Sequence, residues 1–253
     1  MGGWQKPEER GVDRGGRFVF VTRFDLTMRT LRQNAKEAGC LFPVVAALVL
    51  APLARGPAAA APPEQKVIVV LGDSLAAGLG VEPEEAFPAL LRKKIDAAGW
   101  PCTVVNAGVS GDTSADGLAR IGWLLKQRID VLILELGGND GLRGVPVVAT
   151  STNLQAIIDR VKQKYPQARI IIAGMQMPPN LGEEYNAAFR KIYPDLAAIN
   201  HTALIPFLLE GVGGKPELNQ PDHIHPTAEG HKIVADNVWK VLQPILERMN
   251  SNS

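Results

Sequence analysis

Four short segments of the chain carry residue types suited to nucleophilic chemistry. Gly72-Asp73-Ser74 ends an apolar run of strand length, and Gly111 and Asn139 each follow a further apolar run. His225 lies three residues after Asp222 near the end of the chain. A serine hydroxyl is a weak nucleophile alone and needs an adjacent base. Together these residues supply a nucleophile, donors for an oxyanion, a base and a carboxylate to orient that base.

Ser74 is the predicted nucleophile. It follows an apolar strand, and in open α/β sheets the functional crevice lies outside the carboxyl ends of the strands. Gly72 permits a tight turn before it. The pattern differs from the G-x-S-x-G elbow of α/β-hydrolases, which is absent around Ser74. The alternative is that Ser74 only caps the following helix, because serine is a favoured cap. The three later segments favour the nucleophile.

His225 is the predicted general base, and Asp222 would fix its tautomer and stabilise the imidazolium. Their spacing can return the carboxylate to the same imidazole within one turn of chain. The alternative for Asp222 is a helix or turn cap. His223 could compete for the role of base, but we expect it to be exposed. His201 and His231 are expected to be surface or packing residues.

Three groups are expected to stabilise the oxyanion: the backbone N–H groups of Ser74 and Gly111 and the side-chain amide of Asn139. Glycine lets a ligand approach its N–H closely. The alternatives are a turn residue at Gly111 and a cap or turn former at Asn139. Three nearby polar residues either support these loops or are structural turn residues, the reading we prefer: Asp73, Asn106 and Asp140.

The segment Met175-Gln176-Met177-Pro178-Pro179-Asn180-Leu181-Gly182 follows a fourth apolar run, so we expect it on the same rim. Its adaptable apolar side chains suit a groove for an acyl chain, and Leu142 is placed on the other wall. The alternative is a loop packed on the core. The predicted substrate-binding residues are Leu142, Met177, Pro178 and Pro179.

These segments resemble the four blocks of the GDSL/SGNH hydrolase superfamily, whose Ser, Gly, Asn and His would here be Ser74, Gly111, Asn139 and His225. The resemblance runs from about Lys66 to about Arg248. It is closest to the bacterial group of acyl-CoA thioesterase I, protease I, lysophospholipase and arylesterase.

The resemblance implies a serine esterase and thioesterase that hydrolyses fatty acyl thioesters, lysophospholipids or aryl esters through an acyl-enzyme on Ser74. It implies no metal and no organic cofactor, a small-molecule acyl substrate, and no nucleic acid or obligate protein partner. The enzymatic alternative is a carbohydrate deacetylase of the same superfamily. A non-catalytic binding module is disfavoured by the intact Ser74, Asn139, Asp222 and His225.

Strands and helices alternate after residue 62, which favours a parallel sheet covered on both faces. We expect a three-layer α/β/α sandwich of flavodoxin type with five parallel strands; the order 2-1-3-4-5 is implied by the resemblance. The predicted strands are 66–71, 102–105, 131–136, 169–173 and 203–207. The predicted helices are 84–98, 113–128, 152–165, 183–198 (interrupted near Pro194) and 226–247 (with Pro226 in first position).

Residues 1–61 read as an amino-terminal extension plus a secretory signal peptide, followed by one hydrolase domain over 62–253. Basic residues at 29, 32 and 36 precede an apolar run at 41–53, and small residues follow at 58–61. We expect translation to start at Met28 and the mature protein to be secreted or periplasmic. The alternative is an uncleaved membrane anchor, although the run is short for a membrane span.

Composition excludes some other classes. Hydrophobic residues make up 46% and charged residues 21% of the chain, which is ordinary for a globular protein. The net charge of +1 gives no electrostatic argument for binding nucleic acid. Cys102 is the one cysteine of the predicted domain, so no disulfide can form within it, and we expect Cys102 in the core.

Overall fold

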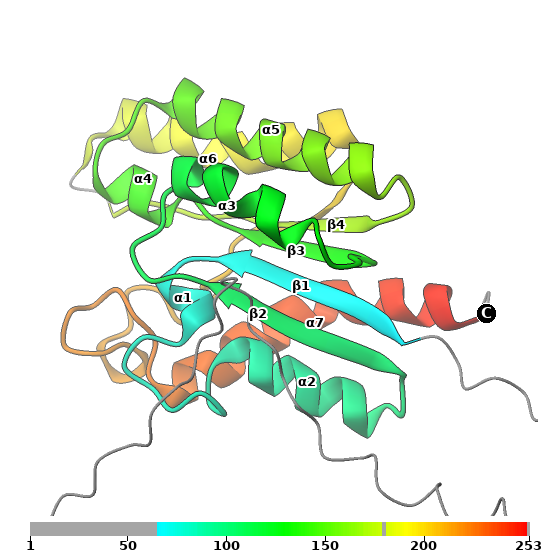
Figure 1. Ribbon diagram of the computed structural model, residues 1–253. Coiled ribbons are helices and arrows are strands. Elements are labelled where there is room, and N and C mark those ends of the chain that lie inside the picture. Colours follow the sequence, from blue (N-terminus) through cyan, green and yellow to red (C-terminus); the bar gives the residue numbers. More distant parts are fainter. Residues whose placement is uncertain (1–64, 179–180, 252–253) are drawn as a thin grey trace, which may run out of the picture. The chain divides into compact units, whose positions relative to one another are not determined.

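The computed structural model describes residues 65–178 and 181–251 (Figure 1). The predicted leader therefore lies outside the described residues. Five parallel strands form one sheet in the order β2-β1-β3-β4-β5, which confirms the predicted fold. The strands are β1 (Lys66–Gly72), β2 (Cys102–Gly108), β3 (Val131–Glu135), β4 (Arg169–Ala173) and β5 (Ala203–Ile205).

Helices cover both faces of the sheet, as Figure 1 shows. Helices α2 and α7 contact each other on one face, and α3, α5 and α6 form the other layer. The longer helices are α2 (Phe87–Ala97), α3 (Ser114–Leu124), α5 (Val147–Lys164), α6 (Glu183–Asn200) and α7 (Ala228–Ser251). Two short helices follow strands directly: α1 (Ser74–Ala77) after β1 and α4 (Gly138–Leu142) after β3.

The central strands are apolar because both faces of the sheet are covered. Ile68 to Leu71 of β1 and Val131 to Leu134 of β3 are at most 1% exposed. Local signals set the helix starts. Thr113 caps α3 in a capping box with Asp116, and Pro88 occupies the first turn of α2.

Several predicted boundaries are wrong. Helix α5 begins at Val147, five residues earlier than predicted, directly after Pro146, whose φ of −53° suits a helix start. Helix α6 runs through Pro194 without interruption. It buries side chains on both sides of the proline, including Phe189 and Leu196, and this packing outweighs one lost backbone hydrogen bond.

The closing helix also differs from the prediction. Helix α7 begins at Ala228, and Pro226 instead forms an isolated antiparallel bridge with Asn219. The bridge therefore joins the two ends of the loop that precedes α7. This matters because Asp222 and His225 lie within that loop.

The layer of α2 and α7 is closed by aromatic side chains. The indole rings of Trp100, just before β2, and Trp239, on α7, stack with centroids 5.7 Å apart. Cys102 is buried at the start of β2, which confirms its predicted place in the core. Within 65–178 and 181–251, no helix is long and apolar enough to span a membrane.

Candidate active site

The predicted site residues converge because parallel strands end at one edge of the sheet. Ser74 begins α1 directly after β1, Gly111 lies in the loop after β2, and Asn139 lies in α4 after β3. Asp73 caps α1, with its side chain accepting a hydrogen bond from the Leu75 N–H. Ser74 is only 7% exposed, so its hydroxyl is held in a largely enclosed position.

Three of the predicted residues form a hydrogen-bonded chain. Ser74 Oγ lies 2.8 Å from His225 Nε2, and His225 Nδ1 lies 2.6 Å from Asp222 Oδ2. Burial alone would raise the pKa of the Asp222 carboxyl. Hydrogen bonds from the His225 ring and from the N–H groups of His225 and Ile224 outweigh burial and lower that pKa to about 2. Asp222 is therefore an anion at neutral pH.

The loop that carries His225 is braced at its base. The Gln220 N–H donates to His225 O over 2.7 Å, and the Thr227 N–H donates to Leu218 O. The Gln220 side-chain amide donates to Leu79 O and to Pro226 O. Since Leu79 follows α1 and its N–H donates to Ser74 O, Gln220 joins the histidine loop to the segment of the serine.

The other histidines lie outside this chain. His223 is exposed, as predicted, and has a left-handed backbone with φ of 59°. A residue without a side chain would fit such a conformation with less strain. His201 caps the carboxyl end of α6. His231 is buried against Phe87 in the layer of α2 and α7, and desolvation lowers its pKa to about 4.

The predicted oxyanion donors lie in the segments that follow β1, β2 and β3. Among the described residues, no hydrogen bond takes up the backbone N–H of Ser74 or of Gly111. Gly111 has φ of +87°, a conformation that favours glycine, and Arg143 Nη2 donates to its carbonyl over 3.0 Å. Asn139 Nδ2 donates to Asp112 O at 3.0 Å and, more weakly, to Asp73 Oδ2 at 3.3 Å.

The three predicted supporting residues all hydrogen-bond the loops of the site. Asp73 contacts Leu75 and Asn139 as described. Asn106 donates to Ala76 O and accepts from the Gly108 N–H. Asp140 is fully buried and accepts from Ser114 N and Oγ and from Thr150 Oγ1. Each side chain therefore ties one strand-end segment to another.

Sequence reasoning missed three charged residues beside the site. Arg143 holds Gly111, as above. Arg120 on α3 pairs with Asp112 at 2.6 Å and donates to Gly72 O at 2.9 Å. Glu135 ends β3 and is fully buried next to Gly72. A signal for Glu135 was present in the sequence, because an acid in an otherwise apolar strand needs an explanation.

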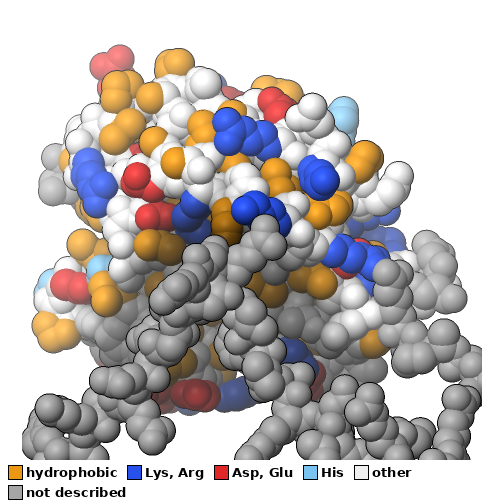
Figure 2. All heavy atoms as spheres, viewed as in Figure 1, with side chains coloured by type: hydrophobic (Ala, Val, Ile, Leu, Met, Phe, Trp, Pro, Cys, Tyr) orange, Lys and Arg blue, Asp and Glu red, His pale blue; other side chains and the backbone are white. Residues whose placement is uncertain are grey.

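Two of the predicted substrate-binding residues, Leu142 and Met177, lie at α4. Leu142 is 40% exposed. Met177 packs against Gly141, where any added Cβ would collide with its sulfur. The carbonyl of Pro178 accepts a hydrogen bond from Asn186 Nδ2. Pro179 lies outside the described residues. In Figure 2, hydrophobic side chains lie beside histidine and acidic side chains at the left edge, over the loop after β5.

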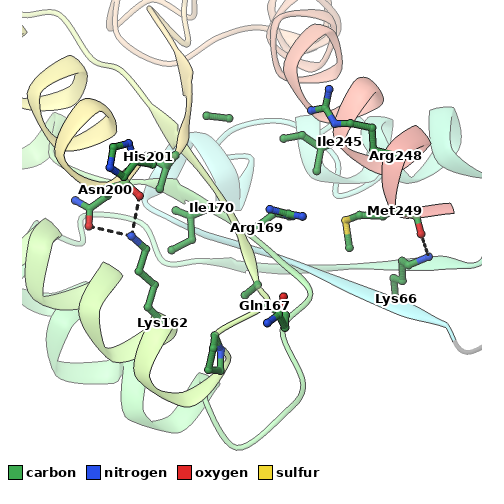
Figure 3. Close-up of a pocket in the computed structure, with 14 residues that line it drawn as sticks. Lys66, Lys162, Gln167, Arg169, Ile170, Asn200, His201, Ile245, Arg248 and Met249 are labelled. Atoms are coloured by element: carbon green, nitrogen blue, oxygen red, sulfur yellow. Dashed lines mark hydrogen bonds between the residues drawn. The ribbon is translucent and has the colours of Figure 1, made fainter. Parts of the chain in front are cut away.

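A cavity of about 810 Å³ lies at the opposite edge of the sheet (Figure 3). It is lined by Lys66 and Arg169, the first residues of β1 and β4, so it is separate from the serine. Its two lysines have structural partners at helix ends: Lys66 donates to Met249 O, and Lys162 donates to Asn200 O. Among the described residues, no three His, Cys, Asp or Glu side chains gather as metal ligands.

The serine–histidine–aspartate chain at the carboxyl edge of this parallel α/β sheet is the arrangement found in serine hydrolases. The chain matches the model of the GDSL-like Lipase/Acylhydrolase family over residues 70–233 and belongs to that family. It is a hydrolase that acts on ester bonds.

Characterised relatives carry related names. The chain is 41% identical to Esterase TesA of Pseudomonas aeruginosa over 182 residues, which are 72% of this chain and 90% of that protein. It is 43% identical to Thioesterase 1/protease 1/lysophospholipase L1 of Escherichia coli K12 over 182 residues, 71% of this chain and 84% of that protein. Over 176 residues, 69% of this chain and 87% of the other, it is 40% identical to an arylesterase of Vibrio mimicus.

Solved structures agree with the fold. The crystal structure of TesA has a TM-score of 0.68 at 41% identity, with 71% of this chain and 99% of that chain covered. The psychrotrophic esterase EstA from Pseudoalteromonas, in a structure inhibited by monoethylphosphonate, also scores 0.68, at 32% identity, with 72% and 99% covered. A family 3 carbohydrate esterase from Clostridium thermocellum scores 0.61 at 23% identity, a likeness of fold alone.

Proposed function

We propose that this hydrolase cleaves acyl esters and thioesters of apolar acyl chains through a covalent acyl-enzyme on Ser74. The observation that carries the proposal is the chain from Ser74 Oγ through His225 to Asp222, with links of 2.8 and 2.6 Å. Such a chain activates a hydroxyl that is otherwise a weak nucleophile.

In the first half-reaction, Ser74 Oγ attacks the acyl carbon while His225 Nε2 takes the hydroxyl proton. Asp222 stabilises the imidazolium that results and keeps its Nδ1–H directed away from the serine. The leaving alcohol or thiol takes its proton from His225. In the second half-reaction, His225 takes a proton from a water whose oxygen attacks the acyl carbon. The bond from that carbon to Ser74 Oγ then breaks, the acid leaves, and Oγ takes the proton from His225.

The charge of each tetrahedral intermediate falls on one oxygen. We expect the N–H groups of Ser74 and Gly111 to donate to it, with the Asn139 amide as the third donor. Nδ2 of that amide donates to Asp112 O at 3.0 Å and to Asp73 Oδ2 at 3.3 Å. To donate to the oxyanion, the amide would give up its longer hydrogen bond, the one to Asp73. We therefore expect Asp73 to influence how readily Asn139 donates to the oxyanion.

Exposed hydrophobic side chains around the site favour a substrate with an apolar acyl chain. Each of the four site segments contributes one large hydrophobic side chain that is between 40% and 46% exposed: Leu79, Val109, Leu142 and Ile224. A sugar substrate would call for polar side chains there. The names of the relatives, which include thioesterase, lysophospholipase and arylesterase, support the same substrate class.

Ser74→Ala tests the proposal. We expect hydrolysis of p-nitrophenyl esters and acyl thioesters of increasing chain length to disappear, because no other group can form the acyl-enzyme. Labelling by a fluorophosphonate should disappear with it. Ser110→Ala is the matched control, since Ser110 is an exposed serine one residue from Gly111 and should retain full activity. Turnover by folded Ser74→Ala protein, or labelling at another serine, would refute the mechanism.

The chain-length series also tests the substrate class. Activity that rises with the length of the acyl chain is expected from the apolar rim. Activity confined to acetyl groups, and highest on acetylated sugars, would instead make the enzyme a carbohydrate deacetylase.

We further propose that residues 1–61 are a leader removed on export, with the mature enzyme secreted or periplasmic. The order of basic, apolar and small residues supports this. Amino-terminal sequencing of exported protein should find a first residue near Ala61 or Pro62. A mature protein that starts at Met1 or Met28 would contradict it.

A further inference from the structure

Two acids lie fully buried beneath the site, and their surroundings differ. Asp140, at 1% exposure, accepts three hydrogen bonds from Ser114 and Thr150. Glu135, at 0% exposure, accepts one from the Asp73 N–H at 3.1 Å through Oε2, and its Oε1 has no hydrogen-bond partner among the described residues. A buried ionised carboxylate with so few donors is costly.

Glu135 lies directly under the nucleophile. It pairs with Gly72 in the sheet, and a Cβ on Gly72 would collide with Glu135 Oε2. Only Asp73 separates Gly72 from Ser74 in the chain. A shift of the Glu135 side chain would therefore displace the turn that presents the serine.

Asp73 is the neighbour that connects Glu135 to the reacting groups. It is 2% exposed, its Oδ1 accepts from the Leu75 N–H at 3.0 Å, and its Oδ2 accepts from Asn139 at 3.3 Å. Its carboxyl thus braces both the helix of Ser74 and one predicted oxyanion donor.

Within the part of the chain that the structure describes, no lysine or arginine forms an ion pair with either of these acids. Among the charged and titratable groups that face them, Arg120 is engaged with Asp112 and with Gly72 O. The other groups are the Tyr193 hydroxyl, which donates to Leu136 O, the already satisfied Asp140, and His225 of the catalytic chain. Two ionised carboxylates at this depth would repel each other strongly, so such pairs hold one proton between them.

We propose that Glu135 is a positioning residue that stays protonated beside an ionised Asp73 and, by accepting a hydrogen bond from the Asp73 N–H, holds Asp73 in the orientation that supports Ser74 and Asn139. The inference rests on the proposed function of those two residues. Glu135 holds the proton and Asp73 holds the negative charge, because Asp73 has the donors of Leu75 and Asn139 to stabilise an anion.

The acid–base properties of the pair agree with this assignment. Burial first, and then the charge of Asp73, raise the pKa of Glu135 well above its ordinary value. Burial also raises the pKa of Asp73, but the Leu75 N–H and Glu135 itself oppose it and leave that pKa at about 6. Asp73 is therefore the first of the two to ionise.

Glu135→Gln and Glu135→Leu separate the proposal from a merely space-filling role. Glutamine keeps a neutral donor and an acceptor for the Asp73 N–H, so kcat should stay within about twofold of wild type. Leucine removes both, so kcat should fall about 10- to 100-fold by misplacement of Ser74 and Asn139, with KM little changed. Equal activity of Glu135→Leu, or equal damage from both variants, would overturn the proposal.

A second readout covers the case in which Glu135→Leu fails to fold. Because the folded pKa of Glu135 is raised, its contribution to stability is complete below the unfolded pKa and is lost as pH rises. Glutamine cannot lose that proton. Relative to wild type, Glu135→Gln should therefore become progressively more stable as pH rises above 4.5, the ordinary pKa of a glutamate. A loss of stability over this range would mean that Glu135 works as an anion, and the proposal would fail.

Asp140→Asn is the matched control. Its three donors favour an anion, so the amide should destabilise the protein at neutral pH, unlike Glu135→Gln. Fluorophosphonate labelling of Ser74 distinguishes this inference from the proposed function. If Ser74→Ala remains active, the proposed function has failed; if Ser74→Ala is inactive while Glu135→Leu is unimpaired, only the role of Glu135 has failed.

Discussion

The candidate site has an exposed half and a buried half. In the exposed half, the side chains of Asp222 and His225 are 44% and 16% exposed and lie three residues apart on one loop. In the buried half, Asp73, Glu135 and Asp140 are at most 2% exposed and come from segments far apart in the chain. In the proposed mechanism, the first half moves the proton, and the second half supports the donors for the oxyanion.

The two halves differ in the interactions that hold their side chains in place. In the exposed half, short-range contacts within one loop hold the carboxylate against the ring, and water screens its charge. In the buried half, hydrogen bonds between strand ends do the same work without screening. Changes in the exposed half should therefore alter chemistry and spare stability, whereas changes in the buried half should alter both.

The largest effect is expected for His225→Ala. His225 transfers the proton in both half-reactions, so kcat should fall on the order of 10⁶-fold, as for loss of the nucleophile. His223→Ala is the matched control. His223 is exposed and lies outside the hydrogen-bonded chain, so its removal should leave steady-state kinetics nearly unchanged. The opposite rank order would mean that the other histidine is the base.

Asp222→Asn should have a smaller effect. The amide keeps a group of the same shape but loses the charge that supports the imidazolium, so kcat should fall about 10⁴-fold. The thermal midpoint should fall modestly near neutral pH, because the variant loses the contribution of a carboxylate that is 44% exposed and screened by water. Its contribution to stability is present above the ordinary pKa of 3.8 and is lost only as pH falls towards about 2. A variant that unfolds at neutral pH would break the contrast between the halves.

The smallest of these losses is expected for Asn139→Ala. Removal of one oxyanion donor should lower kcat about 10²- to 10³-fold. Loss of its bonds to Asp112 O and Asp73 should also cost about 1 kcal/mol of unfolding free energy, measured by denaturant titration. Asn153→Ala removes a hydrogen bond to Ser114 Oγ, which is not part of the chain of Ser74. This variant should lose stability and keep its kcat. A stable but slow Asn139→Ala protein would weaken the coupling that we assign to the buried half.

Much of the fold was predictable because its strands are buried on both faces. The apolar run that follows Arg169 predicted a strand at 169–173, and these bounds match β4. Helix ends were predicted less well where tertiary contacts decide them. Pro194 reads as an interruption from local propensity, yet the side chains around it are packed too well for α6 to end there. The short helices α1 and α4 have too few residues for any periodicity to indicate them.

The candidate site divides in the same way. Ser74, Asp222 and His225 could be selected because their types and spacing already suggest chemistry. Glu135 and Arg143 could not be assigned a purpose, because their partners, Asp73 and Gly111, are distant in the chain. Burial decides whether such an acid keeps its proton, and burial is a property of the folded chain alone.

The stacked indoles of Trp100 and Trp239 have a practical consequence. They come from the turn before β2 and from the last helix, and neither belongs to the hydrogen-bonded chain of Ser74. Two rings in such contact should couple their electronic transitions and produce a near-ultraviolet dichroic band that is lost when α7 separates. This band would therefore report whether the layer of α2 and α7 is intact. For an inactive variant, it would show without any label whether the fold has been kept.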